Sequence, residues 1–386
     1  MRSPVRINFC NTNRLNVLVN LLSGNILPIT SDGSELSLIS KLYAICTWII
    51  ELIYISACVI GIFRVSKETA LRECTVNIVI AVEVLLNLSH MYHQRNLLKQ
   101  LVDSYNGLLA GDDDLLRTTV VSYVGPVEKL LKLYTIADVG SVITWVATPL
   151  MIIFQKTEFV HEDYALPISF SKEPFSRGVF IASVILEIFG SGYAILKKIG
   201  TDIYTLHLIL LLTAQYKYMR TKLGLILRNE TSRVKIEFNS LLRHHSEVVR
   251  ATIMLKKVLS FNVCVVHLDS VFRFCFLSFM LATNTSINME GCLVLAYSVG
   301  AIIQLYMICF YIQELFEAGT MLTDDAFHAP WYSYELSIRQ NFRIMIYANR
   351  LKCRLASFQS VDLTLPSFMQ IINQAYSTCL LFLKVK

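Results

Sequence analysis

Long apolar stretches alternate with short polar segments along the chain, and this pattern decides the class of structure. Seven stretches have the roughly 20 mainly apolar residues that a helix needs to cross a bilayer. They are Leu42–Phe63, Cys74–Tyr92, Leu130–Phe154, Phe175–Leu196, Val258–Ala282, Met289–Ile312 and Leu363–Val385. A membrane β-barrel would show segments of about ten residues with alternating polarity instead. The pattern therefore predicts an all-α, multi-pass membrane protein with seven transmembrane helices.

A further apolar run, Ile203–Met219, follows the fourth predicted span after the pair Lys197 and Lys198. It is either an eighth, buried helix or a continuation of the fourth helix into a region packed by protein. Asp202 and the lysine pair would be costly in lipid. We therefore expect the fourth helix to continue through this run.

The composition supports lipid as the solvent of most of the chain. Of the 386 residues 54% are hydrophobic and only 17% are charged, whereas a soluble domain has about 25% charged residues. The net charge of +6 comes from basic residues in loops between the apolar runs. Such a distribution is typical of membrane topology and not of a nucleic-acid-binding face. We expect no nucleic-acid partner.

The basic residues also predict the orientation of the chain. Lys197–Lys257 contains twelve Lys and Arg residues and Gln313–Arg354 contains five, whereas Arg64–Glu73 and Gln155–Arg177 contain three each. Because short cytoplasmic loops carry the excess of basic residues, we expect a cytoplasmic N-terminus and long cytoplasmic helix extensions. This orientation is the inverse of that of a G-protein-coupled receptor.

Four regions follow from this topology. Residues 1–41 form a cytoplasmic N-terminal segment, 42–312 a six-helix transmembrane bundle, 313–362 a cytoplasmic helical anchor and 363–386 the seventh helix. The sequon that begins at Asn284 lies in a predicted outer loop and is the glycosylation candidate.

Motifs of enzyme chemistry are missing from the sequence. It contains no H-E-x-x-H, no G-x-G-x-x-G and no G-x-x-x-x-G-K-[ST] motif. His244 and His245 are adjacent, so they cannot share one helix face as metal ligands would. We therefore predict no catalytic residues, no metal site, no cofactor and no enzymatic activity.

Four acidic residues lie within or at the edge of predicted spans: Glu51, Glu83, Asp138 and Glu187. Acids inside a membrane are either functional or paired with a polar group of the bundle. They form no acid–base pair that the sequence alone supports, and both interpretations stay open.

The last predicted helix carries an unusual stripe at the helical period of 3.6 residues. The stripe consists of Gln370, Asn373 and Gln374, Ser377, Leu381 and Val385. It is polar over two turns and apolar over the last. A water-lined helix that closes at an apolar constriction has this pattern, because hydrophobic rings gate by dewetting. The alternative is a helix that packs through interhelical hydrogen bonds.

From Asp324 onward the chain resembles the insect odorant receptor family. The resemblance rests on Trp331-Tyr332, on the basic stretch from Arg339 to Ile346, on Leu363-Thr364-Leu365-Pro366-Ser367-Phe368 and on Ala375-Tyr376-Ser377. Pro174-Phe175 before the fourth span and the layout of the following helices extend it over about the last 210 residues.

This resemblance implies a subunit of a ligand-gated, non-selective cation channel in which the last helices of four subunits line one pore. By position, Leu381 and Val385 match the gate of the family and Lys384 matches a polar residue at the pore mouth. A lysine there departs from the family pattern. The resemblance also implies a plasma-membrane location, on the dendrites of sensory neurons.

The family includes a co-receptor with a large insertion before the fifth span, and the corresponding stretch, Lys222–Lys257, is short here. The chain is therefore similar to a tuning subunit that binds odorant and joins the co-receptor in a heterotetramer. A channel of the related gustatory receptor family is the alternative, but those receptors usually end in a different motif, which Ala375-Tyr376-Ser377 does not match. A transporter would need discontinuous helices or repeated halves, and neither is present.

The resemblance further implies an odorant pocket in the outer half of the bundle, between spans two and six. A pocket for a small volatile molecule should be apolar and aromatic with one or two polar groups. The residues at the right depth are Trp145, Thr148, Phe180, Glu187, Phe276 and Tyr297. Ordinary packing inside the bundle is the alternative for each of them. A buried Glu187 would favour a ligand with an amine or a hydroxyl group.

Overall fold

The computed structural model describes residues 7–29, 37–66, 70, 75–111, 113–164, 173–228, 234–283, 289–350, 356–357 and 361–385. Its long helices are α3 (Leu38–Ile62), α5 (Thr75–His93), α6 (Arg95–Leu109), α7 (Asp114–Ile152), α8 (Arg177–Arg228), α9 (Val234–Thr283), α10 (Met289–His328), α11 (Leu336–Arg350) and α12 (Leu365–Val385). The short elements are α1 (Phe9–Thr12), α2 (Arg14–Ser23), the 3₁₀ turns His161–Asp163 and Trp331–Ser333, and the antiparallel pair β1 (Ala356–Ser357) and β2 (Val361–Asp362). The predicted glycosylation site Asn284 lies outside the described residues.

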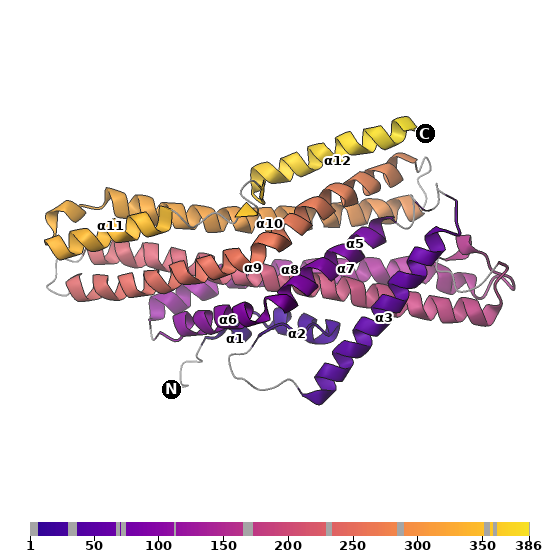
Figure 1. The fold of residues 1–386 in the computed structure, drawn as a ribbon, viewed down its shortest axis with the longest axis horizontal. Helices are drawn as coiled ribbons and strands as arrows, with labels where there is room; N and C mark the ends of the chain where they lie inside the picture. Colours follow the sequence, from indigo (N-terminus) through magenta and orange to yellow (C-terminus); the bar gives the residue numbers. More distant parts are fainter. Residues whose placement is uncertain are drawn as a thin grey trace.

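The molecule is an elongated bundle in which α7, α8, α9 and α10 run along the long axis (Figure 1). Six of the described helices are long and apolar enough to cross a membrane, namely α3, α5, α7, α8, α9 and α10. The seventh predicted span also forms a helix, α12, over nearly the predicted residues. The prediction of an all-α, multi-pass membrane protein is confirmed.

Helix α8 is the centre of the bundle and continues without a break for 52 residues. It passes through Lys197 and Lys198, as the sequence predicted, and contacts α2, α3, α5, α7, α9 and α10. Both lysines are buried, and each meets an acid from another helix. Lys197 pairs with Glu51 of α3, and the Nζ atom of Lys198 lies 2.6 Å from Oε2 of Glu83 of α5. The charges are tolerated because each has a partner inside the protein.

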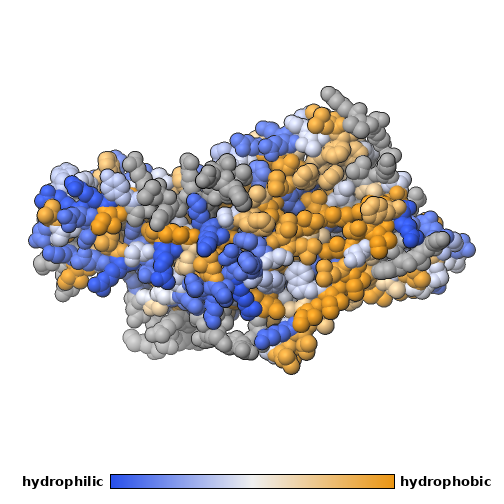
Figure 2. Space-filling view, in the orientation of Figure 1, coloured by the Kyte–Doolittle hydropathy of each residue, from blue (hydrophilic) through white to orange (hydrophobic). Residues whose placement is uncertain are grey.

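The surface has an apolar middle part (Figure 2). Apolar residues gather over α3, α5 and the neighbouring parts of α9 and α10, whereas hydrophilic residues gather at the end that carries α6 and α11, which we call the hydrophilic end, and a smaller group of them lies at the opposite end. Helix α3 illustrates the apolar part. It exposes Leu38 (73%) and Ile39 (78%) and buries a stripe that includes Thr47, Glu51 and Tyr54. A spacing of three to four residues is the period of one helix face, so the opposite face is left for lipid.

Helices α3 and α8 approach closely at Gly190. A Cβ atom at this position would clash with the ring of Tyr54, whereas a Cβ at Gly192 would meet nothing within 4 Å. We expect Gly190→Ala to push α3 away from α8 and to lower the melting temperature of the purified protein by several degrees. Gly192→Ala is the matched control and should leave the melting temperature unchanged. Equal melting temperatures for the two variants would contradict this packing.

The described part of the N-terminal segment folds against the bundle. Phe9 of α1 is fully buried and contacts the rings of Tyr105, Tyr204 and His207, at centroid distances of 6.3, 5.9 and 4.6 Å. In α2, Asn20 donates a hydrogen bond to the carbonyl oxygen of Gly200 (3.4 Å). The segment therefore belongs to the packed core of α6 and α8.

The hydrophilic end is held together by ion pairs and aromatic stacking. Lys217 of α8 pairs with Glu314 of α10 at 2.8 Å, and the rings of Phe238 and Phe342 stack at 4.3 Å. Asp113 caps α7 by accepting a hydrogen bond from Leu115 N (3.0 Å) and pairs with Lys222. Burial acts to raise the pKa of Asp113, but hydrogen bonds from Lys222 and Tyr218 outweigh it and hold the pKa below its ordinary value.

Candidate functional site

A mainly apolar cavity lies inside the bundle between α5, α7, α8, α9 and α10. Its walls include Ile80, Trp145, Ile195, Leu277, Met280 and Tyr297, together with the polar residues Asn77, Ser141 and Ser191. Ser141 and Trp145, like Ser191 and Ile195, are four residues apart. Each helix therefore presents one face to the cavity, because residues at this spacing are neighbours on a helix surface.

The cavity measures about 80 Å³, which is less than the several hundred Å³ of typical ligand pockets. A ligand of odorant size therefore requires the lining side chains to move apart. Met280 is suited to this, since methionine has three rotatable bonds and adapts to irregular spaces. A mainly apolar lining with a few polar groups is the usual composition of a small-molecule site.

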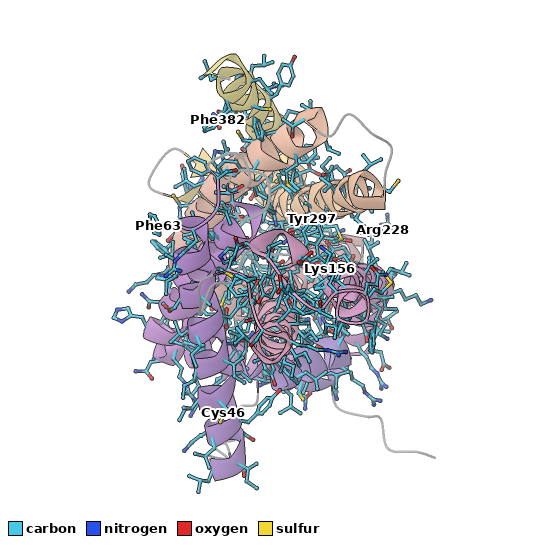
Figure 3. All side chains as sticks on the ribbon, turned by 90° about the vertical axis from the view of Figure 1, so that its right-hand side faces the viewer. Cys46, Phe63, Lys156, Arg228, Tyr297 and Phe382 are labelled. Atoms are coloured by element: carbon cyan, nitrogen blue, oxygen red, sulfur yellow. The ribbon has the colours of Figure 1, made fainter. Side chains whose placement is uncertain are left out.

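Two of the predicted ligand contacts, Trp145 and Tyr297, lie on this wall. Figure 3 looks along the bundle from the end that carries Lys156 and shows Tyr297 among the side chains of the interior. Thr148 lies one turn beyond Trp145 on α7, but its side chain is outside the described part of the structure.

The other three predicted contacts lie elsewhere. Phe180 is fully buried in a small aromatic cluster at the start of α8, where its ring stacks on Phe159 at 4.1 Å. Glu187 is also fully buried, one turn before Ser191, whose hydroxyl donates to the Glu187 carbonyl oxygen (2.5 Å). Phe276 faces α12, with its ring 5.9 Å from that of Phe382. None of these three side chains lines the cavity.

A cluster of buried charges lies next to the cavity, and we call it the ionic cluster. Its members are Glu83 (α5), Lys198 and Asp202 (α8), and Asp269 and Arg273 (α9), all buried. Lys198 is 2.6 Å from Glu83 and 3.8 Å from Asp202, and Arg273 is 3.8 Å from Asp269. The cluster ties three helices together at the level where the cavity ends.

Helix α12 carries the predicted pore residues. It buries Ser367, Ile371, Ala375 and Cys379, which are four residues apart, against the rest of the chain. The opposite side exposes Gln370, Gln374, Ser377 and Leu381, and Leu381 is 64% exposed. Lys384 and Val385 continue the helix, but their side chains are outside the description. Gln370, Ser377 and Leu381 are thus directed away from their own subunit, whereas Gln374 is exposed but hydrogen-bonded to His267 of α9.

Helix α9 contacts both features. Its residues Leu277 and Met280 line the cavity, while Cys275 and Phe279 form a small buried cluster with Cys379 of α12. Figure 1 shows the two helices side by side, with α12 at the edge of the bundle. Helix α9 therefore connects the cavity wall to α12 by direct contact.

These features define a helical multi-pass membrane protein with an internal small-molecule cavity and a separate helix with an outward polar stripe. A family model described as "7tm Odorant receptor" matches residues 71–376. The chain therefore belongs to the odorant receptor family. Membership places it among membrane receptors and not among enzymes.

The fold is similar to that of the insect olfactory receptor OR5 from Machilis hrabei. The structure of this receptor superposes with a TM-score of 0.82, and its complex with eugenol with a TM-score of 0.81. In both cases 97% of each chain is covered at 13% sequence identity, so the likeness concerns the fold. Odorant receptor 67c of Drosophila melanogaster is 20% identical over 137 residues, which are 35% of this chain and 33% of that receptor. The alignment thus spans about a third of this relative.

Proposed function

We propose that this chain is the odorant-binding subunit of a ligand-gated, non-selective cation channel and that it shares the pore with the odorant co-receptor. The observation that carries the proposal is the position of α9, which lines an apolar cavity on one side and contacts α12 on the other. Membership of the odorant receptor family supports the same function. A volatile organic ligand fits the cavity lining, and eugenol in the complex of the Machilis hrabei receptor is such a molecule.

The mechanism follows from a shift between two arrangements of the bundle. A ligand can change the equilibrium only by the difference between its affinities for the open and closed states. In the proposed open state the lining side chains have moved apart to admit the ligand and α9 has shifted. Because α12 packs on α9 through Cys379 and Phe382, this shift moves Leu381 away from the pore axis.

Assembly and location complete the proposal. The exposed side of α12 is available for three further subunits around one pore, and we propose a heterotetramer with the co-receptor in the plasma membrane of sensory-neuron dendrites. The distribution of Lys and Arg favours a cytoplasmic N-terminus, so the hydrophilic end of the bundle lies in the cytoplasm.

The test measures the ligand-evoked membrane current of transfected cells. Cells that express this chain together with the co-receptor should show a cation current in response to a member of an odorant panel, and cells with this chain alone should show little. Cells with the co-receptor alone are the control. Robust ligand-evoked current from this chain alone would contradict the role of a subunit that depends on the co-receptor.

A further inference from the structure

The cavity ends on the ionic cluster, because the same helices supply both. On three helices a residue of the wall is followed or preceded by a charged residue one turn away. These pairs are Ile80 and Glu83 on α5, Ile195 and Lys198 on α8, and Leu277 and Arg273 on α9. Residues three or four apart lie on the same face of a helix, so the charged side chains form the floor of the cavity.

The bases of this floor are already engaged by acids. Lys198 lies 2.6 Å from Glu83, and Arg273 pairs with Asp269 and donates a hydrogen bond to Gln304 (3.1 Å). Asp202 accepts hydrogen bonds from Tyr134 (3.1 Å) and from Gln304, and it lies 3.8 Å from Lys198. Within the ionic cluster two basic side chains, Lys198 and Arg273, thus face the three acids Glu83, Asp202 and Asp269.

A fourth acid, Asp138, lies at the same level on α7. In the part of the chain that the structure describes, no Lys or Arg lies within 4 Å of its carboxylate. It is directed towards α10, where a Cβ atom on Gly300 would lie 3.9 Å from its Oδ1 atom. Asp138 is one turn below Ser141, and Gly300 is one turn below Tyr297, and both Ser141 and Tyr297 line the cavity.

The hydroxyl group of Tyr134 is a side-chain hydrogen-bond partner of this half-buried carboxylate, and the positive charges of Lys198 and Arg273 attract it from beyond 4 Å. Hydrogen bonds to an ionised group are about twice as strong as those between neutral groups. Ser141 cannot act as the donor, because its hydroxyl donates to the backbone carbonyl oxygen of Asp138 (2.7 Å). A carboxylate has about four acceptor positions, so Asp138 can still accept a hydrogen bond from a donor group that a ligand brings into the cavity.

We propose that Asp138 accepts a hydrogen bond from the ligand and makes the receptor selective for small apolar molecules with a strong donor group, namely a primary amine or a hydroxyl. The inference rests on the function proposed above and names the ligand class of that cavity. One helical turn, about 5.4 Å, separates Asp138 from the wall. The donor therefore sits at the end of an arm of two or three carbons that extends from an apolar body.

The test compares head groups on a constant skeleton. For each of four skeletons (phenylethyl, phenylpropyl, hexyl and octyl), the primary amine, the alcohol, the methyl ether and the hydrocarbon are applied to cells that co-express the chain and the co-receptor. We expect the amine or the alcohol of at least one skeleton to act at a concentration about tenfold or more below that of its ether. Asp138→Leu should abolish this difference, and Asp138→Glu, which keeps the charge, should retain it.

The control variant is Glu314→Gln, which also replaces an acid but lies far from the cavity in the pair with Lys217. It should keep the ranking of head groups. Surface labelling identifies variants that fail to fold. If Asp138→Leu fails to reach the surface, the comparison of head groups is made with Asp138→Glu. If ethers or hydrocarbons act as well as the donors, or if Asp138→Leu weakens all four head groups equally, the inference is overturned while the odorant receptor function stands. Failure of the whole odorant panel to evoke any current that depends on the co-receptor would overturn the function itself.

Discussion

Replacing Lys197 by methionine is expected to remove most of the protein from the cell surface. The ammonium group of Lys197 pairs with Glu51 and lies 3.7 Å from the centre of the Trp48 ring, and both charged side chains are completely buried. The substitution leaves the Glu51 carboxylate without its base in the interior. Removing one partner of a buried ion pair costs about 3–5 kcal/mol, which is a large part of the total stability of a typical protein.

A second substitution tests this explanation. Lys197→Met combined with Glu51→Leu removes both charges, and replacement of a whole buried pair by apolar residues is often neutral. We expect the double variant to recover surface labelling that the single variant loses. Lys156→Met is the matched control, because Lys156 pairs with Asp163 in a loop and its side chain is 51% exposed, and such pairs contribute little. A double variant no better than Lys197→Met would show that the pair is not the cause.

Most of the helical architecture could be predicted from the pattern of apolar residues. The predicted spans lie within or close to the observed helices, because lipid offers no partner for backbone groups and permits only continuous helices of sufficient length. The continuation of α8 was predictable for the same reason, since Lys197 and Lys198 required a protein environment. Their partners could not be predicted, because Glu51 and Glu83 are more than 100 residues away in the sequence.

The residues of the cavity were harder to predict than those of the pore helix. In a membrane bundle the lipid side and the protein side of a helix are both apolar, so hydropathy does not show which face is turned inwards. Trp145 and Tyr297 lie on the wall, but Phe180 and Phe276 pack against other aromatic rings. Phe276 is the neighbour of the wall residue Leu277 and differs from it by the rotation of the helix, whereas Phe180 lies at the start of α8, several turns before the wall residues Ser191 and Ile195.

The acids Glu187 and Asp138 show how much of the ligand specificity could be predicted from the sequence. Glu187 is buried as expected, but it lies outside the cavity wall. Asp138, which the sequence presented only as one of four acids in the spans, lies one turn below the wall and faces α10. Which of the acids lies near the cavity depends on the neighbouring helices. Asp138 can approach α10 because Gly300 has no side chain. In our proposal Asp138, and not Glu187, is therefore the acid that selects a ligand with a donor group.

The stripe on α12 was visible in the sequence because polar residues in a membrane helix are costly and therefore mark a special environment. The structure adds the direction of this stripe. Ile371, Ala375 and Cys379 face the subunit, and Leu381 points away from it. In a tetramer built around α12, the Leu381 side chains of neighbouring subunits would approach one another and form an apolar ring.

Replacing Leu381 by alanine is therefore expected to raise the current that flows without ligand several-fold. A narrow apolar ring closes a pore because water leaves it, and ions cannot cross a dry constriction. Shortening the side chain widens the ring and lets water return. The measurement is the basal current of cells that co-express the variant and the co-receptor, normalised to the amount of protein at the surface.

Met369→Ala provides the matched control for this experiment. Met369 is 56% exposed on the same helix, but it is not part of the stripe and lies about three turns from Leu381. Loss of its side chain should leave the basal current unchanged, because Met369 takes no part in the proposed apolar ring. If Leu381→Ala responds normally to ligand and its basal current equals that of the parent channel, then Leu381 packs against a neighbouring helix and the gate lies elsewhere.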